Sequence, residues 1–159
     1  SGLDSTAMGH STKASGENST AMGDTTKALG DFSTAMGDTT TAEGKYSTAM
    51  GYKTKASDYG SLAIGQYNLD GSGEPTSFKK SNTAFVIGNG EDNDNKSDAF
   101  KVDYKGNMTA SGNVTANSII LDDLEQTPND DDSVDGQLIL YNGALKYYTN
   151  GAWYTLKTD

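Results

Sequence analysis

Residues 19–37 read STAMGDTTKALGDFSTAMG, with the same pentapeptide, STAMG, at both ends. The spacing of this stretch continues in both directions along the chain. Ala recurs at every seventh residue from Ala7 to Ala63, and Ser or Thr lies two residues before each Ala. Gly lies two residues after each Ala except at Asp58. Such strict spacing predicts a structure in which near-identical turns stack on one another.

The seven-residue period does not describe a helix. Apolar residues of a coiled coil alternate in steps of three and four, whereas Ala and Met are adjacent here, and each Gly would cost a helix about 1 kcal/mol. We interpret the unit as a five-residue strand, S/T-x-A-x-G, followed by a two-residue corner. Alternation places Ser5 and Ala7 on one face and Thr6 and Met8 on the other. We expect the small face to line a narrow interior and each Gly to end its strand at a corner of positive φ.

On the larger face the period doubles to 14, because Met follows alternate Ala residues and mostly Ser, Leu or Glu follows the others. Each 14-residue coil therefore has one apolar and one polar strand. Burial of a Met side chain contributes about 1.5–3 kcal/mol to stability. We therefore expect another surface to cover the Met column. In a cyclic oligomer, identical chains would cover one another's Met columns. A monomeric solenoid covered by its own C-terminal half is the alternative. The predicted trimer interface comprises Met8, Met22, Met36, Met50 and Ile64.

The units STAMG, SLAIG and TKALG resemble the S-x-A-I-G repeats of YadA-like heads, also called Hep_Hag repeats, of trimeric autotransporter adhesins. The resemblance covers residues 3–65. It implies a left-handed parallel β-roll of 14-residue coils, a homotrimer about the fibre axis, and a role in surface attachment. Met replaces the usual Ile in four coils, which alters packing rather than topology.

Composition narrows the function further. Leu, Ile, Val and Phe number only 23 of 159 residues and the net charge is −10, a composition that without the repeat would indicate disorder. The basic residues are all Lys, so an acidic chain without Arg predicts no nucleic-acid binding. There is no Cys, and no stretch has the composition of a membrane span. With His10 as the single His, no acid, base and nucleophile converge, so we expect no enzyme and no cofactor.

The remainder of the chain predicts four segments after the roll of residues 1–65. Residues 66–83 contain Gly and Pro and favour a connector or neck. Residues 84–121 favour a β-rich shaft, since AFVIGNG and SDAFKVDYKGN are similar to segments of phage-type trimeric tail fibres. Residues 122–136 favour an acidic linker. Residues 137–159 favour an antiparallel meander, because Asn-Gly pairs at 142–143 and 150–151 separate β-rich runs and are the strongest signal for tight hairpin turns.

Two groups of residues are candidates for binding. Tyr148, Trp153 and Tyr154 are candidate receptor contacts that could stack on a sugar, although forming the core of the meander is the alternative for them. Asp92, Asp94 and Asp98 are weak Ca²⁺ candidates in an acidic loop that lacks the closing Glu of an EF-hand, and a solvated loop is the alternative.

The sequence therefore predicts a fibre protein that attaches a cell or particle to a surface receptor, for which a glycan is one candidate. Its expected location is extracellular, on a cell surface or on a virion tail fibre. A purely structural spacer is the main alternative. An ice-binding solenoid is a weaker alternative, because the Thr column that would face ice lies beside the Met column.

Overall fold

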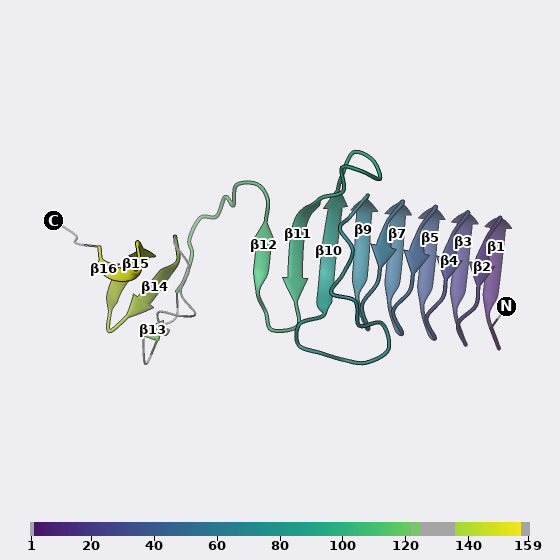
Figure 1. Ribbon diagram of the computed structural model, residues 1–159, viewed down its shortest axis with the longest axis horizontal. Coiled ribbons are helices and arrows are strands. Elements are labelled where there is room, and N and C mark those ends of the chain that lie inside the picture. The colour runs from purple at the N-terminus through teal and green to yellow at the C-terminus, as the bar shows by residue number, and fades with distance from the viewer. Residues whose placement is uncertain (1, 122, 125–135, 157–159) are drawn as a thin grey trace. The chain divides into compact units, whose positions relative to one another are not determined.

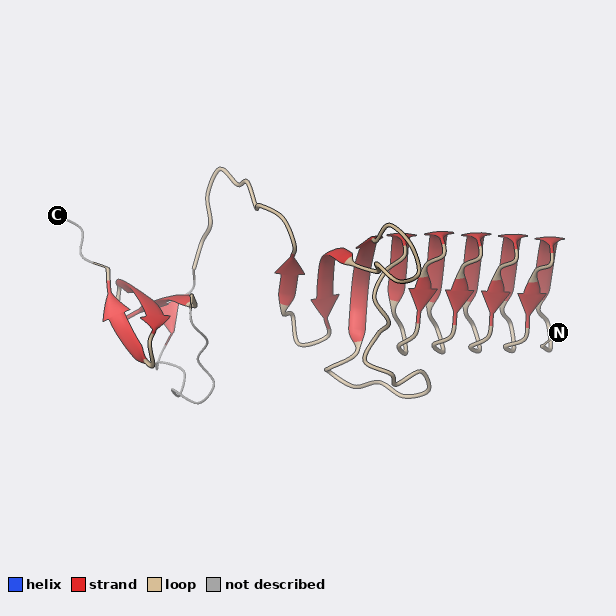
Figure 2. Cartoon of the chain, turned by 45° about the horizontal axis from the view of Figure 1, so that its top comes forward, coloured by secondary structure: helices blue, strands red, loops and turns tan. Residues whose placement is uncertain are grey.

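The computed structural model describes residues 2–121, 123–124 and 136–156, whose strands are labelled in Figure 1. The chain divides into two compact units, of which the first ends at Val114 and the second begins at Thr115. Figure 2 shows strands and loops throughout the described residues and no helix. The prediction of an all-β chain is confirmed, and the predicted acidic linker lies mostly outside the described residues.

The roll, defined here as residues 2–65, is a solenoid whose coils repeat every 14 residues. Each coil has one five-residue strand and one two-residue strand, and all neighbours in each sheet are parallel and in register. The strands begin one residue later than the sequence indicated, and the strands of the polar sheet have two residues instead of the expected five. The long strands are β1 (Thr6–His10), β3 (Thr20–Asp24), β5 (Thr34–Asp38), β7 (Thr48–Tyr52) and β9 (Leu62–Gln66). The short strands are β2 (Lys13–Ala14), β4 (Lys27–Ala28), β6 (Thr41–Ala42) and β8 (Lys55–Ala56).

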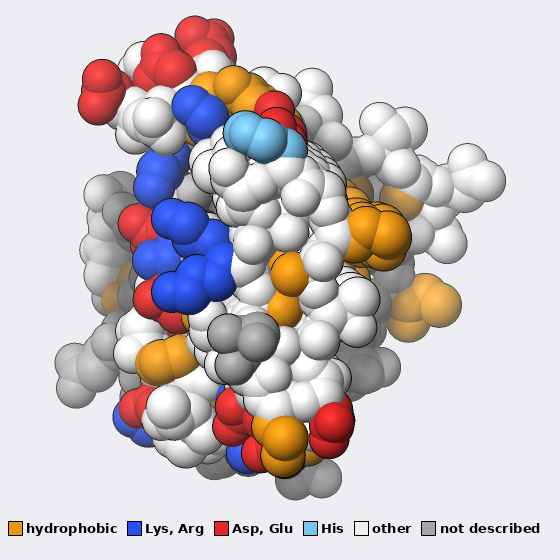
Figure 3. All heavy atoms as spheres, turned by 90° about the vertical axis from the view of Figure 1, so that its right-hand side faces the viewer, with side chains coloured by type: hydrophobic (Ala, Val, Ile, Leu, Met, Phe, Trp, Pro, Cys, Tyr) orange, Lys and Arg blue, Asp and Glu red, His pale blue; other side chains and the backbone are white. Residues whose placement is uncertain are grey.

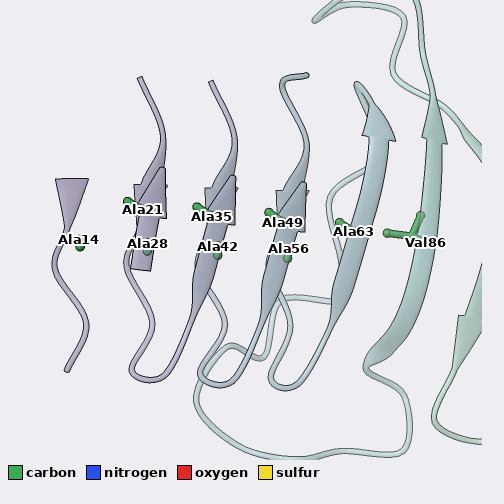
Figure 4. Close-up of a cluster of buried hydrophobic side chains, with 9 residues drawn as sticks. All are labelled: Ala14, Ala21, Ala28, Ala35, Ala42, Ala49, Ala56, Ala63 and Val86. Carbon is green, nitrogen blue, oxygen red and sulfur yellow. The ribbon is translucent and has the colours of Figure 1, made fainter. Parts of the chain in front are cut away.

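The interior of the roll contains only small side chains, as the alternation predicted. Ser19, Thr26 and their equivalents in later coils are buried beside the Ala residues. Figure 4 shows the Ala side chains lying between the strands of the two sheets. Burial of Ala removes little apolar surface from water, so the coils depend on backbone pairing and on contacts outside the interior. The buried apolar cluster comprises Ala14, Ala21, Ala28, Ala35, Ala42, Ala49, Ala56, Ala63 and Val86.

The glycines of the long strands have the positive φ that was expected, for example 123° at Gly23 and 124° at Gly37, whereas those after the short strands do not, and both sets have a second role. Gly23 lies inside β3, and a Cβ there would overlap the carbonyl oxygen of Gly37 in the next coil. Gly30, whose φ is not positive, would meet Gly44 in the same way. Gly is therefore required mainly because successive coils approach too closely for a side chain. The left-handed corner lies elsewhere, at the non-glycine residues Asp4, Ser11, Asn18, Thr25, Phe32, Thr39, Tyr46 and Lys53.

At the end of the roll, a side-chain amide makes the hydrogen bonds that the backbone of a further coil would make. In the coils, the Lys13 N–H donates to the carbonyl 13 residues later, and the Lys27 N–H does the same. The Lys55 N–H instead donates to Oδ1 of the Asn68 side chain at 2.8 Å, and Asn68 Nδ2 donates back to the Lys55 carbonyl at 2.9 Å. The Asn68 amide thus takes the place of the next backbone peptide at the edge of the polar sheet.

Asp58, the one break in the Gly register, anchors the connector. Its carboxylate is fully buried and accepts the N–H groups of Thr83, Ser72 and Gly73 at 2.7, 3.0 and 2.9 Å. Burial by itself would raise the pKa of Asp58, but the hydrogen bonds from Thr83, Ser72 and Gly73 outweigh it and hold the pKa below its usual value. The one residue that departs from the Gly register is therefore the residue that binds the connector to the end of the roll.

The first unit continues beyond the roll in the same sheet. The connector crosses over to β10 (Thr83–Asn89), which pairs in parallel with β9. Two antiparallel strands follow, β11 (Asp98–Asp103) and β12 (Met108–Ala110), and they complete an eight-stranded sheet. The sequence predicted these strands, but the continuity of their sheet with the roll depends on a pairing that only the tertiary structure provides.

The second unit is a four-stranded sheet in the order β13-β14-β15-β16. Asn142 and Asn150 have φ of 50° and 51°, and each is followed by a Gly of positive φ, as the Asn-Gly signal predicted. The predicted three-stranded meander is confirmed as β14 (Leu138–Tyr141), β15 (Ala144–Thr149) and β16 (Ala152–Thr155). A fourth strand, β13 (Asp123–Leu124), pairs in parallel with β14.

Candidate functional site

The outer face of the eight-stranded sheet carries two straight columns of side chains. Met8, Met22, Met36 and Met50 follow one another in register, and a Thr column runs beside them. Met8 is 54% exposed, Met36 37% and Met50 40%, so the described residues leave much of this column uncovered. Figure 3, which looks onto the β1 end, shows hydrophobic side chains on one flank and Lys side chains on the opposite one.

The columns continue past the repeat and become more apolar. Leu62 and Ile64 succeed Thr and Met in β9, and the register places Phe85 beside Leu62 and Ile87 beside Ile64. In β11, Phe100 and Val102 pair with the same β10 residues. No position of the two columns carries a charge. The interface predicted from the repeat is thus part of a longer apolar surface. The extension beyond Ile64 was not predicted, because it depends on the parallel pairing of β9 with β10.

The three aromatic candidates in the second unit do not lie on one face. Tyr148 pairs with Trp153 across β15 and β16, with ring centroids 5.2 Å apart, and Tyr148 is 7% exposed. Tyr154 pairs instead with Tyr147, at 5.5 Å, and is 46% exposed. The indole Nε1 of Trp153 is enclosed and has no hydrogen-bond partner among the described residues. Of the three, Tyr154 is the one whose ring is open to a ligand.

The weak Ca²⁺ candidates are held apart by separate contacts. Asp92 accepts hydrogen bonds from Asn95 and from the N–H of Asp94, which lower its pKa. Asp98 accepts the Leu69 N–H at 2.9 Å, and its burial raises its pKa. The described residues contain no cluster of three or more His, Cys, Asp or Glu side chains suited to a metal ion. They also contain no helix of the length and apolarity that a membrane crossing requires.

A second surface, at the turn that precedes the long strands, combines aromatic rings with paired charges. The rings of Phe32 and Tyr46 stack at 5.1 Å with an interplanar angle of 18°, and Tyr59 contacts Tyr46 edge-on. The Lys45 ammonium lies 5.9 and 5.3 Å from the first two ring centroids and 3.8 Å from a carboxylate oxygen of Asp31. This column was not predicted from the sequence, although the 14-residue separation of Phe32 and Tyr46 could have indicated it.

Beside these rings lies a cavity of about 230 Å³ between the roll and the connector. The connector is fixed there by the Lys45 N–H, which donates to the Pro75 carbonyl at 2.8 Å. Glu43 pairs with the Lys55 ammonium at 3.0 Å, so both acidic groups of the cavity have a basic partner. The lining includes Leu29, Asp31, Glu43, Lys45, Pro75 and Thr76.

Comparison with known proteins bears on the roll. Residues 1–26, 14–40 and 42–68 match the family model of the YadA head domain repeat. No curated protein and no solved structure shows significant similarity to the chain. The matched residues are those that form the 14-residue coils, with Ala and Ser inside and Met outside. The N-terminal coils of this chain are therefore similar to YadA head domain repeats over residues 1–40 and 42–68.

Proposed function

We propose that this chain is the head of a non-enzymatic homotrimeric fibre that attaches a cell or particle to a surface. The observation that carries the proposal is the pair of uncharged columns, one of them mostly Met, on the outer face of the eight-stranded sheet of a solenoid with YadA head repeats. The resemblance to autotransporter adhesins supports attachment, and an extracellular location, on a cell surface or a virion tail fibre, follows from that role.

The spacing of the columns favours a copy of the same chain as the cover. Each Met lies one strand spacing, about 4.8 Å, from the next, so a partner must present apolar groups with the same period. Identical coils have this period, and cyclic symmetry gives each copy the same environment. Exposed contiguous apolar surface of this kind is typical of protein–protein contacts. The proposed trimer interface contains Met8, Met22, Met36, Met50 and Ile64 and extends to Phe85, Ile87, Phe100 and Val102.

The oligomeric state tests this proposal. Met22→Asp combined with Met36→Asp would place charges in the proposed interface, and we expect a monomeric or unfolded chain by sedimentation equilibrium and circular dichroism. Lys13→Asp combined with Lys27→Asp changes the net charge more, but on the outside of the polar sheet, and should leave a folded trimer. A wild-type chain that is monomeric, or a Met22 and Met36 variant that is still a folded trimer, would contradict the proposal.

Attachment is a separate step with its own measurement. We place a receptor contact in the second unit at Tyr148, Trp153 or Tyr154, of which Tyr154 has the most exposed ring. Tyr154→Ala should reduce adhesion of the trimer to target cells at a temperature at which the variant is still folded. Tyr154→Phe keeps the ring and serves as the matched control. Equal adhesion by wild type and Tyr154→Ala would exclude Tyr154 as that contact.

A further inference from the structure

The cavity between the roll and the connector has no role in the trimer interface proposed above. It lies at the turn between β4 and β5, where Leu29 and Asp31 face Pro75 and Thr76 of the connector. Its volume of about 230 Å³ is below the roughly 300–1,000 Å³ of sites for drug-sized ligands. The space therefore suits a ligand of about one ring.

Both carboxylates of the cavity are already paired with a basic group. Asp31 pairs with Lys45 at 3.8 Å. Glu43 pairs at 3.0 Å with Lys55, which lies outside the lining and also approaches Asp70 at 3.7 Å. The lining itself carries two carboxylates and one ammonium group. The excess of carboxylates disfavours an anionic ligand, and the basic partners of both carboxylates weaken their attraction for a cationic one, whereas a neutral ligand with many hydroxyls avoids both costs. Carboxylate oxygens accept from hydroxyls and ammonium groups donate to them, and such charge-assisted bonds are stronger than neutral ones.

The adjoining rings provide the apolar part of the site. Phe32 is 46% exposed and Tyr46 is 47% exposed, although they stack on each other. Lys45 lies over both rings and also lines the cavity, so rings and cavity form one continuous surface. Apolar contact beside a few convergent polar groups is the usual composition of a ligand site, and the apolar face of a sugar ring with its surrounding hydroxyls matches this composition.

From these observations we infer that the surface made by Phe32, Tyr46 and the adjoining cavity binds a neutral saccharide. The inference rests on the proposed attachment role and names a ligand class for it, at a site separate from the second unit. The rings contact the C–H face of the sugar, and Asp31, Glu43 and Lys45 hydrogen-bond its hydroxyls.

The test is an NMR titration of the full chain with the methyl glycosides of glucose, galactose, mannose and N-acetylglucosamine. Tyr46→Asn removes a ring but suits the left-handed backbone, since Tyr46 has φ of 59° and Asn18 holds the equivalent slot at 52°. Thr39→Asn is the matched control, because Thr39 has φ of 56° but neither stacks on Phe32 nor lines the cavity. We expect saturable binding of at least one glycoside, weakened at least tenfold by Tyr46→Asn and unchanged by Thr39→Asn.

Three results would overturn the inference: no saturable binding by any of these glycosides, equal binding by wild type and Tyr46→Asn, or preferential binding of charged N-acetylneuraminic acid or glucosamine. Sedimentation and cell adhesion of the same samples separate this inference from the proposed function. A trimer that adheres to cells without binding any glycoside contradicts only the saccharide site. A monomer that binds a glycoside with the expected Tyr46 dependence contradicts only the trimeric fibre.

Discussion

The roll and the second unit form ordered sheets in different ways. In the roll the fully buried apolar side chains are Ala, and coils touch through glycine backbones. Among the described residues of the second unit the buried ones are Ile139 and Tyr148, and ring pairs lie across the strands. The roll is therefore sensitive to period and backbone spacing, whereas the second unit is sensitive to side-chain volume. A chain with few large apolar residues can thus have a specific structure if its repeat satisfies nearly every backbone group.

The period of the roll gives the largest expected effect. Removal of residues 12–18 brings two Met strands together in succession, so one of them must take the place of a polar strand, and we expect the roll not to fold. Removal of residues 12–25, one full coil, keeps the alternation and should preserve the circular dichroism spectrum. If both deletions fold equally well, the difference between the two strands of a coil does not specify the roll.

Backbone spacing gives the next largest effect. Gly37→Ala would place a Cβ against the carbonyl oxygen of Gly51, at a residue whose φ is +124°. We expect this substitution to lower the free energy of unfolding by more than about 3 kcal/mol. Gly112→Ala is the control, because nothing lies within 4 Å of its added Cβ. Urea denaturation measures both. A small effect of Gly37→Ala would mean that the coils are not as closely packed as described.

Side-chain volume should dominate in the second unit. Tyr148→Ala removes a buried ring, and we expect a loss of about 3–5 kcal/mol in the stability of that unit. Tyr154→Ala, which removes an exposed ring from the opposite face, should cost about 1 kcal/mol or less. Thermal unfolding followed by near-UV circular dichroism distinguishes them. Equal costs would show that burial of Tyr148 does not stabilise the unit.

Asp58 joins the roll to its connector through hydrogen bonds rather than packing, and the expected effect is smaller. Asp58→Asn replaces a carboxylate that accepts several N–H groups, and we expect the free energy of unfolding to fall by about 2–3 kcal/mol. Since the folded-state pKa is lowered, the stabilisation by Asp58 is fully present above its unfolded pKa of about 3.9 and is lost as pH falls through the lower folded-state value.

The pH dependence provides the measurement for Asp58. Urea midpoints recorded from neutral pH to about pH 2 should fall more steeply for wild type than for Asp58→Asn at the acidic end. Asp38→Asn, an exposed change at a strand end, is the control and should follow wild type. Parallel curves for wild type and Asp58→Asn would contradict the anchoring role of this carboxylate.

Much of the fold followed from local sequence patterns, because period and alternation are local properties. The repeat predicted the 14-residue coil, the small interior and the apolar Met column, and the Asn-Gly pairs predicted the hairpin turns. The glycine positions were predicted correctly but for an incomplete reason, since the contact between Gly23 and Gly37 connects different coils. Of the candidate sites, the Met column could be predicted because it repeats, whereas the cavity beside Tyr46 could not.

The sequence by itself determined which side chains point into the coil and which point out, since alternation in a strand leaves no other choice. Only the tertiary structure decided what these faces meet. The pairing of β10 with β9 extends the apolar columns to Phe85, and the Asn68 amide replaces a backbone peptide at the last polar strand. The approach of Pro75 to Lys45 creates the cavity. Each of these contacts joins residues 13 or more positions apart and occurs once in the chain, so neither a local pattern nor the repeat encodes it.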